Sequence, residues 1–67
     1  MILLNGESSD ARAGESVAEV LGRLGLEPDA HGIAVAVDGE VVPRAAWRTF
    51  ALAPDARVEV LTAMQGG

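Results

Sequence analysis

The run Arg57-Val58-Glu59-Val60-Leu61-Thr62-Ala63-Met64-Gln65-Gly66-Gly67 decides how this 67-residue sequence is interpreted. Its first five residues have strong β-strand character, and alternation predicts that Val58 and Val60 face a core while Glu59 and Leu61 face outward. A short spacer and two glycines follow. An extended tail of four residues reaches at most ~13–14 Å beyond a sheet, and residues without a Cβ atom fit a channel too narrow for others.

This run leads to a hypothesis about its last residue. The α-carboxylate of Gly67 is ionised at neutral pH. We expect it to be the functional group of the protein, which the rest of the domain presents to a partner. We expect residues 64–67 to form a flexible tail on a single domain that spans residues 1–67. The alternative is that the diglycine is a flexible end without function.

Composition narrows the class of protein. Apolar residues make up 49% and charged residues 22% of the chain, which is typical of a globular domain. There is no cysteine, and therefore no thiol to act as a nucleophile or metal ligand. The net charge is −5 and the five cations are scattered arginines, which argues against nucleic-acid binding. No apolar run approaches the ~20 residues that span a bilayer, so we expect a cytoplasmic protein without membrane contact.

The first half of the chain predicts a hairpin and a helix. Asn5-Gly6 is a strong turn signal, so residues 1–5 and 9–13 are expected to pair. Ser16 begins a capping box before a helix over residues 16–24, where Gly22 costs ~1 kcal/mol relative to Ala. Close packing against a sheet is one reason for a glycine at such a position, but the sequence does not show it. The apolar positions of this helix lie on one face: Val17, Val20, Leu21 and Leu24.

The second half predicts another hairpin and the end of the core. Residues 33–37 and 40–42 flank the turn Asp38-Gly39, with Val37 opposite Glu40. Residues 44–47 form one tight helical turn, and Trp47 and Phe50 are expected to plug the core. The resulting fold is α+β: a two-layer domain in which one main helix crosses one face of a mixed sheet of four or five strands. The first and last strands are expected to pair in parallel at its centre.

Alternation also gives the sheet an outer face. We expect this face to be flat, apolar and little charged, and to lie beside the tail, with Leu3, Ala34, Ala36 and Leu61 as its members. Contiguous exposed apolar surface often marks a partner site, so we interpret it as a docking face. Self-association is the alternative.

Several motifs together resemble a known family. They are Met-Ile-x-Leu-Asn-Gly at residues 1–6, Ala-Gly-Glu-Ser-Val at 13–17, the run from Val-Ala-Val-Asp-Gly to Val-Val-Pro-Arg-x-x-Trp at 35–47, and Val-Glu-Val-Leu-Thr-Ala-Met-Gln-Gly-Gly at 58–67. The sequence resembles the β-grasp, or ubiquitin-like, domains, and among them the ThiS family of sulfur carriers in thiazole (thiamin) biosynthesis. It departs from the usual family pattern at Asp38, where Asn is common, and at the turn before the last strand.

The resemblance implies a mechanism in which the chain is a carrier and not an enzyme. A ThiF-like adenylating enzyme would use ATP to activate the carboxylate of Gly67. A sulfur donor protein, commonly a persulfide, would then supply sulfur for a thiocarboxylate, which thiazole synthase (ThiG) would consume. Gly66 would give clearance, and Met64 and Gln65 would form the spacer. The carrier itself would bind no cofactor or metal and contain no catalytic residue.

Three alternatives remain open. The small subunit of molybdopterin synthase is a carrier with the same fold, although it is typically longer. A carrier for another sulfur pathway is the second. A ubiquitin-like interaction module that is never activated is the third, and it would need the docking face but not a free terminus.

Overall fold

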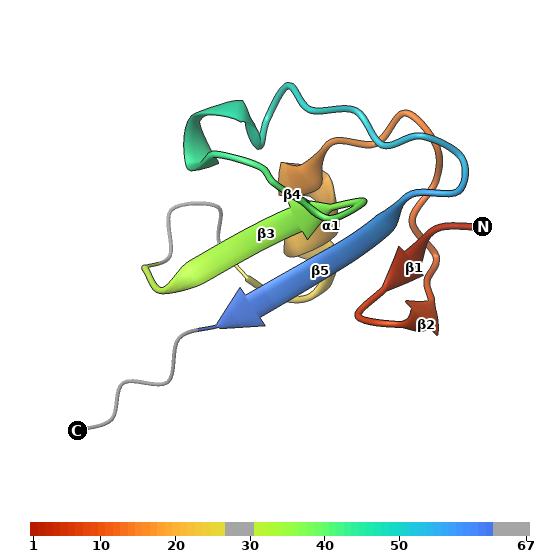
Figure 1. The fold of residues 1–67 in the computed structure, drawn as a ribbon, viewed down its shortest axis with the longest axis horizontal. Helices are drawn as coiled ribbons and strands as arrows, with labels where there is room; N and C mark the ends of the chain where they lie inside the picture. The colour runs from red at the N-terminus through yellow and green to blue at the C-terminus, as the bar shows by residue number, and fades with distance from the viewer. Residues whose placement is uncertain (27–30, 63–67) are drawn as a thin grey trace.

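The computed structural model describes residues 1–26 and 31–62, and within them the chain forms a mixed sheet and one α-helix (Figure 1). The strands are β1 (Leu3–Leu4), β2 (Glu7–Ser8), β3 (Ile33–Val37), β4 (Glu40–Val41) and β5 (Arg57–Thr62), the helix is α1 (Val17–Arg23), and η1 (Arg44–Ala46) is a short 3₁₀ turn. The helix packs on one face of the sheet. This two-layer α+β arrangement confirms the predicted fold class.

β5 is the central strand of a sheet whose order is β2-β1-β5-β3-β4. It pairs in parallel with β1, where Leu3 lies opposite Arg57, and antiparallel with β3, where Val35 lies opposite Val60. The strand that leads toward the C-terminus is therefore hydrogen-bonded on both sides, as predicted from the sequence.

Both hairpins turn through two residues with positive φ. Asn5 and Gly6 have φ of 51° and 84°, and Asp38 and Gly39 have φ of 52° and 85°, which are the angles of type I′ turns. Val37 pairs with Glu40 as predicted. The expectation that residues 9–13 return beside the first strand was wrong. A two-residue turn restarts the strand at once, so the returning strand is β2.

Backbone groups at both ends of helix α1 have hydrogen-bond partners. The Ser16 hydroxyl accepts from the Glu19 amide, and the Glu19 side chain accepts from the Ser16 amide, which confirms the capping box. The first two helical amides donate to the carbonyls of Phe50 and Trp47 at 3.1 and 2.9 Å. The segment after η1 therefore caps the helix, an interaction that sequence periodicity does not reveal.

The C-terminal end of α1 is a Schellman motif. The Leu26 amide donates to the Leu21 carbonyl and the Gly25 amide to the Gly22 carbonyl, both at 3.0 Å, with Gly25 at φ 78°. Leu24 was predicted to lie on the buried stripe, and this was wrong: it is the C-cap and is 43% exposed. Close packing does not account for Gly22, because a Cβ there would meet no neighbouring described atom within 4 Å.

The core lies between α1 and the inner face of the sheet. Its buried members are Ile2, Val17, Val20, Leu21, Val35, Val37, Val42, Trp47, Leu52, Ala56, Val58 and Val60. Trp47 is 2% exposed and its indole N–H donates to the Val42 carbonyl at 2.9 Å, so it plugs the core as predicted. Phe50 does not, since it is 38% exposed and contributes its backbone carbonyl to the helix cap instead.

Candidate functional site

The candidate site is the outer face of the sheet together with the chain that follows β5. Met64, Gln65, Gly66 and Gly67, the four predicted tail residues, lie outside the described residues. The structure describes β5 as far as Thr62, which lies opposite Ile33 of β3. The end of the central strand therefore fixes the point from which the tail sequence departs.

The outer face is organised in rows that cross the strands. Strand partners share a face, so the pair Leu61–Ala34 forms the row nearest the end of β5. The next row contains Glu59, Ala36 and Val41. Leu61 is 65% exposed. Three of the predicted docking residues, Ala34, Ala36 and Leu61, are thus neighbours beside the strand end that leads to the tail. In Figure 1 the helix lies behind β3 and β5, so this face is turned toward the viewer.

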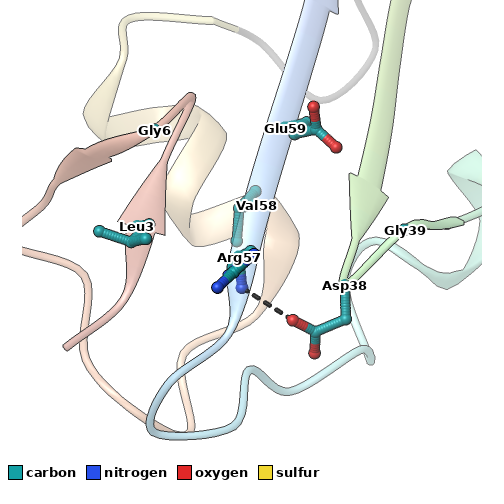
Figure 2. Close-up of a pocket in the computed structure, with 7 residues that line it drawn as sticks. All are labelled: Leu3, Gly6, Asp38, Gly39, Arg57, Val58 and Glu59. Carbon is teal, nitrogen blue, oxygen red and sulfur yellow. Dashed lines mark hydrogen bonds between the residues drawn. The ribbon is translucent and has the colours of Figure 1, made fainter.

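Leu3 is not part of that group. It lies opposite Arg57, at the start of β5, and Leu61 is four residues further along the strand, a distance of about 13 Å. Leu3 and Arg57 line an open hollow of ≈ 600 Å³ that also includes Gly6, Asp38 and Glu59. Figure 2 shows Leu3 on β1 next to Arg57 on β5. The outer face is therefore not the continuous, little-charged patch expected from the sequence, because Arg57 and Glu59 interrupt it.

Val41 extends the apolar group and was not among the predicted residues. It pairs with Ala36 on β4 and is 76% exposed. The signal was present in the sequence, since the register of a two-residue turn at Asp38-Gly39 places position 41 opposite position 36. We call Ala34, Ala36, Val41 and Leu61 the apolar end of the outer face.

The side chains of the two hairpin turns bind the backbone of β5. Asp38 Oδ1 accepts from the Arg57 amide at 3.0 Å (Figure 2). On the other side of the strand, Asn5 Oδ1 accepts from the Val60 amide at 2.8 Å, and Asn5 Nδ2 donates to the Val60 carbonyl at 3.3 Å. Two Asx side chains therefore hold the central strand, one near each end.

Away from this face, the carboxyl of Glu15 has a pKa below its ordinary value. Glu15 accepts from the Arg12 amide and from the guanidinium of Arg23. The amide hydrogen bond first, and the Arg23 hydrogen bond and charge next, hold the pKa of Glu15 below its ordinary value. Glu15 joins the loop before α1 to the last helical turn, which is a structural role. Among the described residues, no group of three or more His, Cys, Asp or Glu could hold a metal ion.

Within those same residues no helix has the length and apolar character needed to cross a membrane. In the part of the chain that the structure describes, the outer face presents the charged side chains of Asp38, Arg57 and Glu59 and an apolar end. What it offers chemically is a surface for contact beside a strand end.

Comparison with known proteins identifies the family. The model of the ThiS family matches residues 2–67. No curated protein sequence matches this chain. A crystal structure of a thiamine biosynthesis protein (ThiS) from Geobacter metallireducens is similar with a TM-score of 0.75 and 29% identity, over 98% of this chain and 97% of that one. A solution structure of a thiamine biosynthesis protein from the same organism has the same TM-score and identity and covers 98% of this chain and 86% of that one. The chain belongs to the ThiS family of β-grasp domains.

Proposed function

We propose that this chain is the sulfur carrier of thiazole formation in thiamin biosynthesis and that the carboxylate of Gly67 carries the sulfur. The observation that carries the proposal is the family match, which extends through the diglycine to residue 67. The geometry supports it, because the tail sequence follows the strand that is hydrogen-bonded on both sides.

The proposed chemistry begins with activation of a poor acyl donor. A carboxylate oxygen of Gly67 attacks the α-phosphorus of ATP bound by a ThiF-like enzyme, the α–β phosphoanhydride bond breaks, and pyrophosphate leaves. A sulfur nucleophile then attacks the acyl carbon, and AMP leaves with the oxygen to which it was bonded. Hydrosulfide gives the thiocarboxylate directly with release of one proton. A protein persulfide gives an acyl disulfide, whose S–S bond a thiol reduces.

The roles of the chain's own residues are positional. Gly66 leaves the acyl carbon accessible because it has no Cβ, and Met64 and Gln65 give the tail its reach. We propose that Ala34, Ala36 and Leu61 dock the activating enzyme and thiazole synthase (ThiG), and that Leu3 touches a partner at the other end of the face. ATP belongs to the activating partner in this scheme, and the chain itself holds no cofactor.

Intact-mass measurement tests the proposal. The protein is incubated with ATP, sulfide and a ThiF-like enzyme from the same cell, and we expect it to gain the mass difference between sulfur and oxygen. A variant lacking Gly67 and a variant with one residue added after Gly67 are the controls, and neither should change. No mass change with an enzyme that is active on another carrier would overturn the proposal and leave the ubiquitin-like interaction module as the remaining interpretation.

A second assay separates thiazole formation from the other sulfur pathways. The thiocarboxylated protein is mixed with thiazole synthase and its other substrates, or with the large subunit of molybdopterin synthase and its pterin substrate. We expect sulfur to leave the carrier only in the thiazole reaction. Transfer to the pterin alone would assign the chain to molybdopterin synthesis.

A further inference from the structure

Asn5 occupies an unusual place in the sheet, at the point where β1 ends and β5 continues. The backbone ladder between the two strands runs from the Leu3 amide to the Ala56 carbonyl at 3.0 Å and from the Asn5 amide to the Val58 carbonyl at 2.8 Å. The chain then leaves β5 through the type I′ turn, with Asn5 at φ 51°. Without a further contact, the next backbone groups of β5 on this side would lose their partner strand.

The Asn5 side chain continues the ladder. Its carboxamide accepts from the Val60 amide at 2.8 Å and donates to the Val60 carbonyl at 3.3 Å, so it presents one acceptor and one donor as a strand residue does. Val60 is two residues before the end of β5. On the opposite side, Val60 lies opposite Val35 of β3. The Asn5 side chain thus gives β5 a hydrogen-bonding partner on the β1 side for one residue pair beyond the end of β1, while β3 pairs with β5 on the other side.

We propose that Asn5 is a positioning residue for the C-terminal tail: its carboxamide fixes the direction in which β5 delivers Gly67 to the activating enzyme. The proposal rests on the proposed carrier function. Its physical basis is that a reacting group gains rate when its supporting element has one orientation, and a small misplacement costs much of that gain. Asparagine suits both requirements of the position, since it tolerates positive φ and has a donor and an acceptor on one short side chain.

The chain provides a matched control at the other hairpin. Asp38 has nearly the same φ, 52°, sits in the same turn type and accepts from the Arg57 amide at 3.0 Å, but it binds the start of β5 and not the end. Glycine adopts positive φ without cost. Asn5→Gly therefore removes two side-chain hydrogen bonds to β5 and Asp38→Gly removes one, and both leave the turn backbone unstrained.

The experiment measures two quantities on each variant. Amide hydrogen exchange followed by NMR reports the protection of Val60, Leu61 and Thr62. Steady-state kinetics of ATP-dependent activation by the ThiF-like enzyme reports kcat and KM, with the carrier as the varied substrate. For Asn5→Gly we expect reduced protection at these amides and a kcat lower by about tenfold, with little change in KM. Asp38→Gly should keep the protection of Val60, and its kcat should fall much less than that of Asn5→Gly.

A third variant tests the chemistry of the side chain. Asn5→Asp keeps the acceptor for the Val60 amide and loses the donor to the carbonyl, so we expect a kcat between those of Asn5→Gly and the wild type. Wild-type kcat in Asn5→Gly would overturn the proposal. An equal loss in Asp38→Gly would also overturn it, because general loosening of the sheet would then explain both. Failure of the wild type itself to be activated would overturn the carrier function. Unchanged hydrogen exchange at Val60 in Asn5→Gly would overturn the claim that the Asn5 carboxamide holds this part of β5.

Discussion

At the scale of single residues, Glu15 makes the stability of this domain depend on pH. Its carboxylate accepts from the Arg12 amide at 2.6 Å and from Arg23 Nε at 3.0 Å, and the side chain is 14% exposed. These contacts favour the ionised form and hold the pKa of Glu15 below its ordinary value. Between the lowered and the ordinary pKa the unfolded chain binds more protons than the folded one, so stability falls as the pH falls through this window.

We predict that Glu15→Gln destabilises the domain at neutral pH and that the difference from the wild type shrinks in acid. Above about pH 5, higher than the carboxyl pKa of the unfolded chain, the ionised contacts contribute fully. Below the lowered pKa, a protonated Glu15 resembles the amide of the variant. Urea unfolding of both proteins at a series of pH values checks this. A stability difference that does not vary with pH would show that charge on Glu15 has no role.

At the scale of elements, helix α1 depends on its ends more than on its length. It has seven residues, fewer than an isolated helix needs in water. Its capping box, the carbonyls of Trp47 and Phe50, and the Schellman motif satisfy groups that a short helix would otherwise expose. Gly22, inside the helix, and Gly25, in the Schellman motif, are therefore expected to contribute differently to the stability of the domain.

We predict opposite signs for the same substitution at these glycines. Gly22 is within the helix and exposed, and a Cβ there meets no described neighbour within 4 Å, so Gly22→Ala should stabilise the domain by about 0.5–1 kcal/mol. Gly25 has φ 78°, and Gly25→Ala should destabilise it by about 1–2 kcal/mol because a side chain disfavours this conformation. Thermal unfolding followed by circular dichroism measures both. Stabilisation by both variants would contradict the αL role assigned to Gly25.

At the scale of the whole molecule, the two faces of the sheet differ: the inner face packs in the core, and the outer face is exposed. The inner face of the sheet is covered by α1 and contributes to the core, whereas Leu61 and Val41 on the outer face are 65% and 76% exposed. Large exposed apolar side chains on a domain of this size are expected to contribute to partner binding and little to stability. The apolar end of the outer face is thus the surface that we propose docks an activating enzyme.

We predict that Leu61→Arg raises KM for activation about tenfold while kcat and the free energy of unfolding stay near wild-type values. The reason is that a docking contact is present in the bound state and in the transition state alike. Leu24→Arg is the matched control, since Leu24 is also an exposed leucine, 43% exposed, but lies at the end of α1 on the other layer. Equal effects of the two variants would indicate a general charge effect and exclude docking through Leu61.

Local sequence signals account for most of the fold because their interactions lie within a few residues of one another. The capping box joins Ser16 to Glu19, and each type I′ turn is encoded by an adjacent pair, Asn5-Gly6 or Asp38-Gly39. Strand alternation then predicted correctly that Val58 and Val60 are buried. One error arose from a distant partner, because the carbonyl of Phe50 caps α1. The error at Leu24 was local, because Leu24 is the C-cap, where the helix has already ended.

By itself the sequence determined the α+β class, the central place of β5, the turn types and the family, because these follow from periodicity, from turn and cap chemistry, and from a motif that extends to Gly67. The tertiary structure alone decided which outer-face residues of β5 lie beside those of β1 and β3. Strand register groups Leu61 with Ala34 and separates both from Leu3. It alone also joined Asn5 to Val60, 55 residues apart, because a side-chain contact of that separation depends on how the strands pair and not on any local preference.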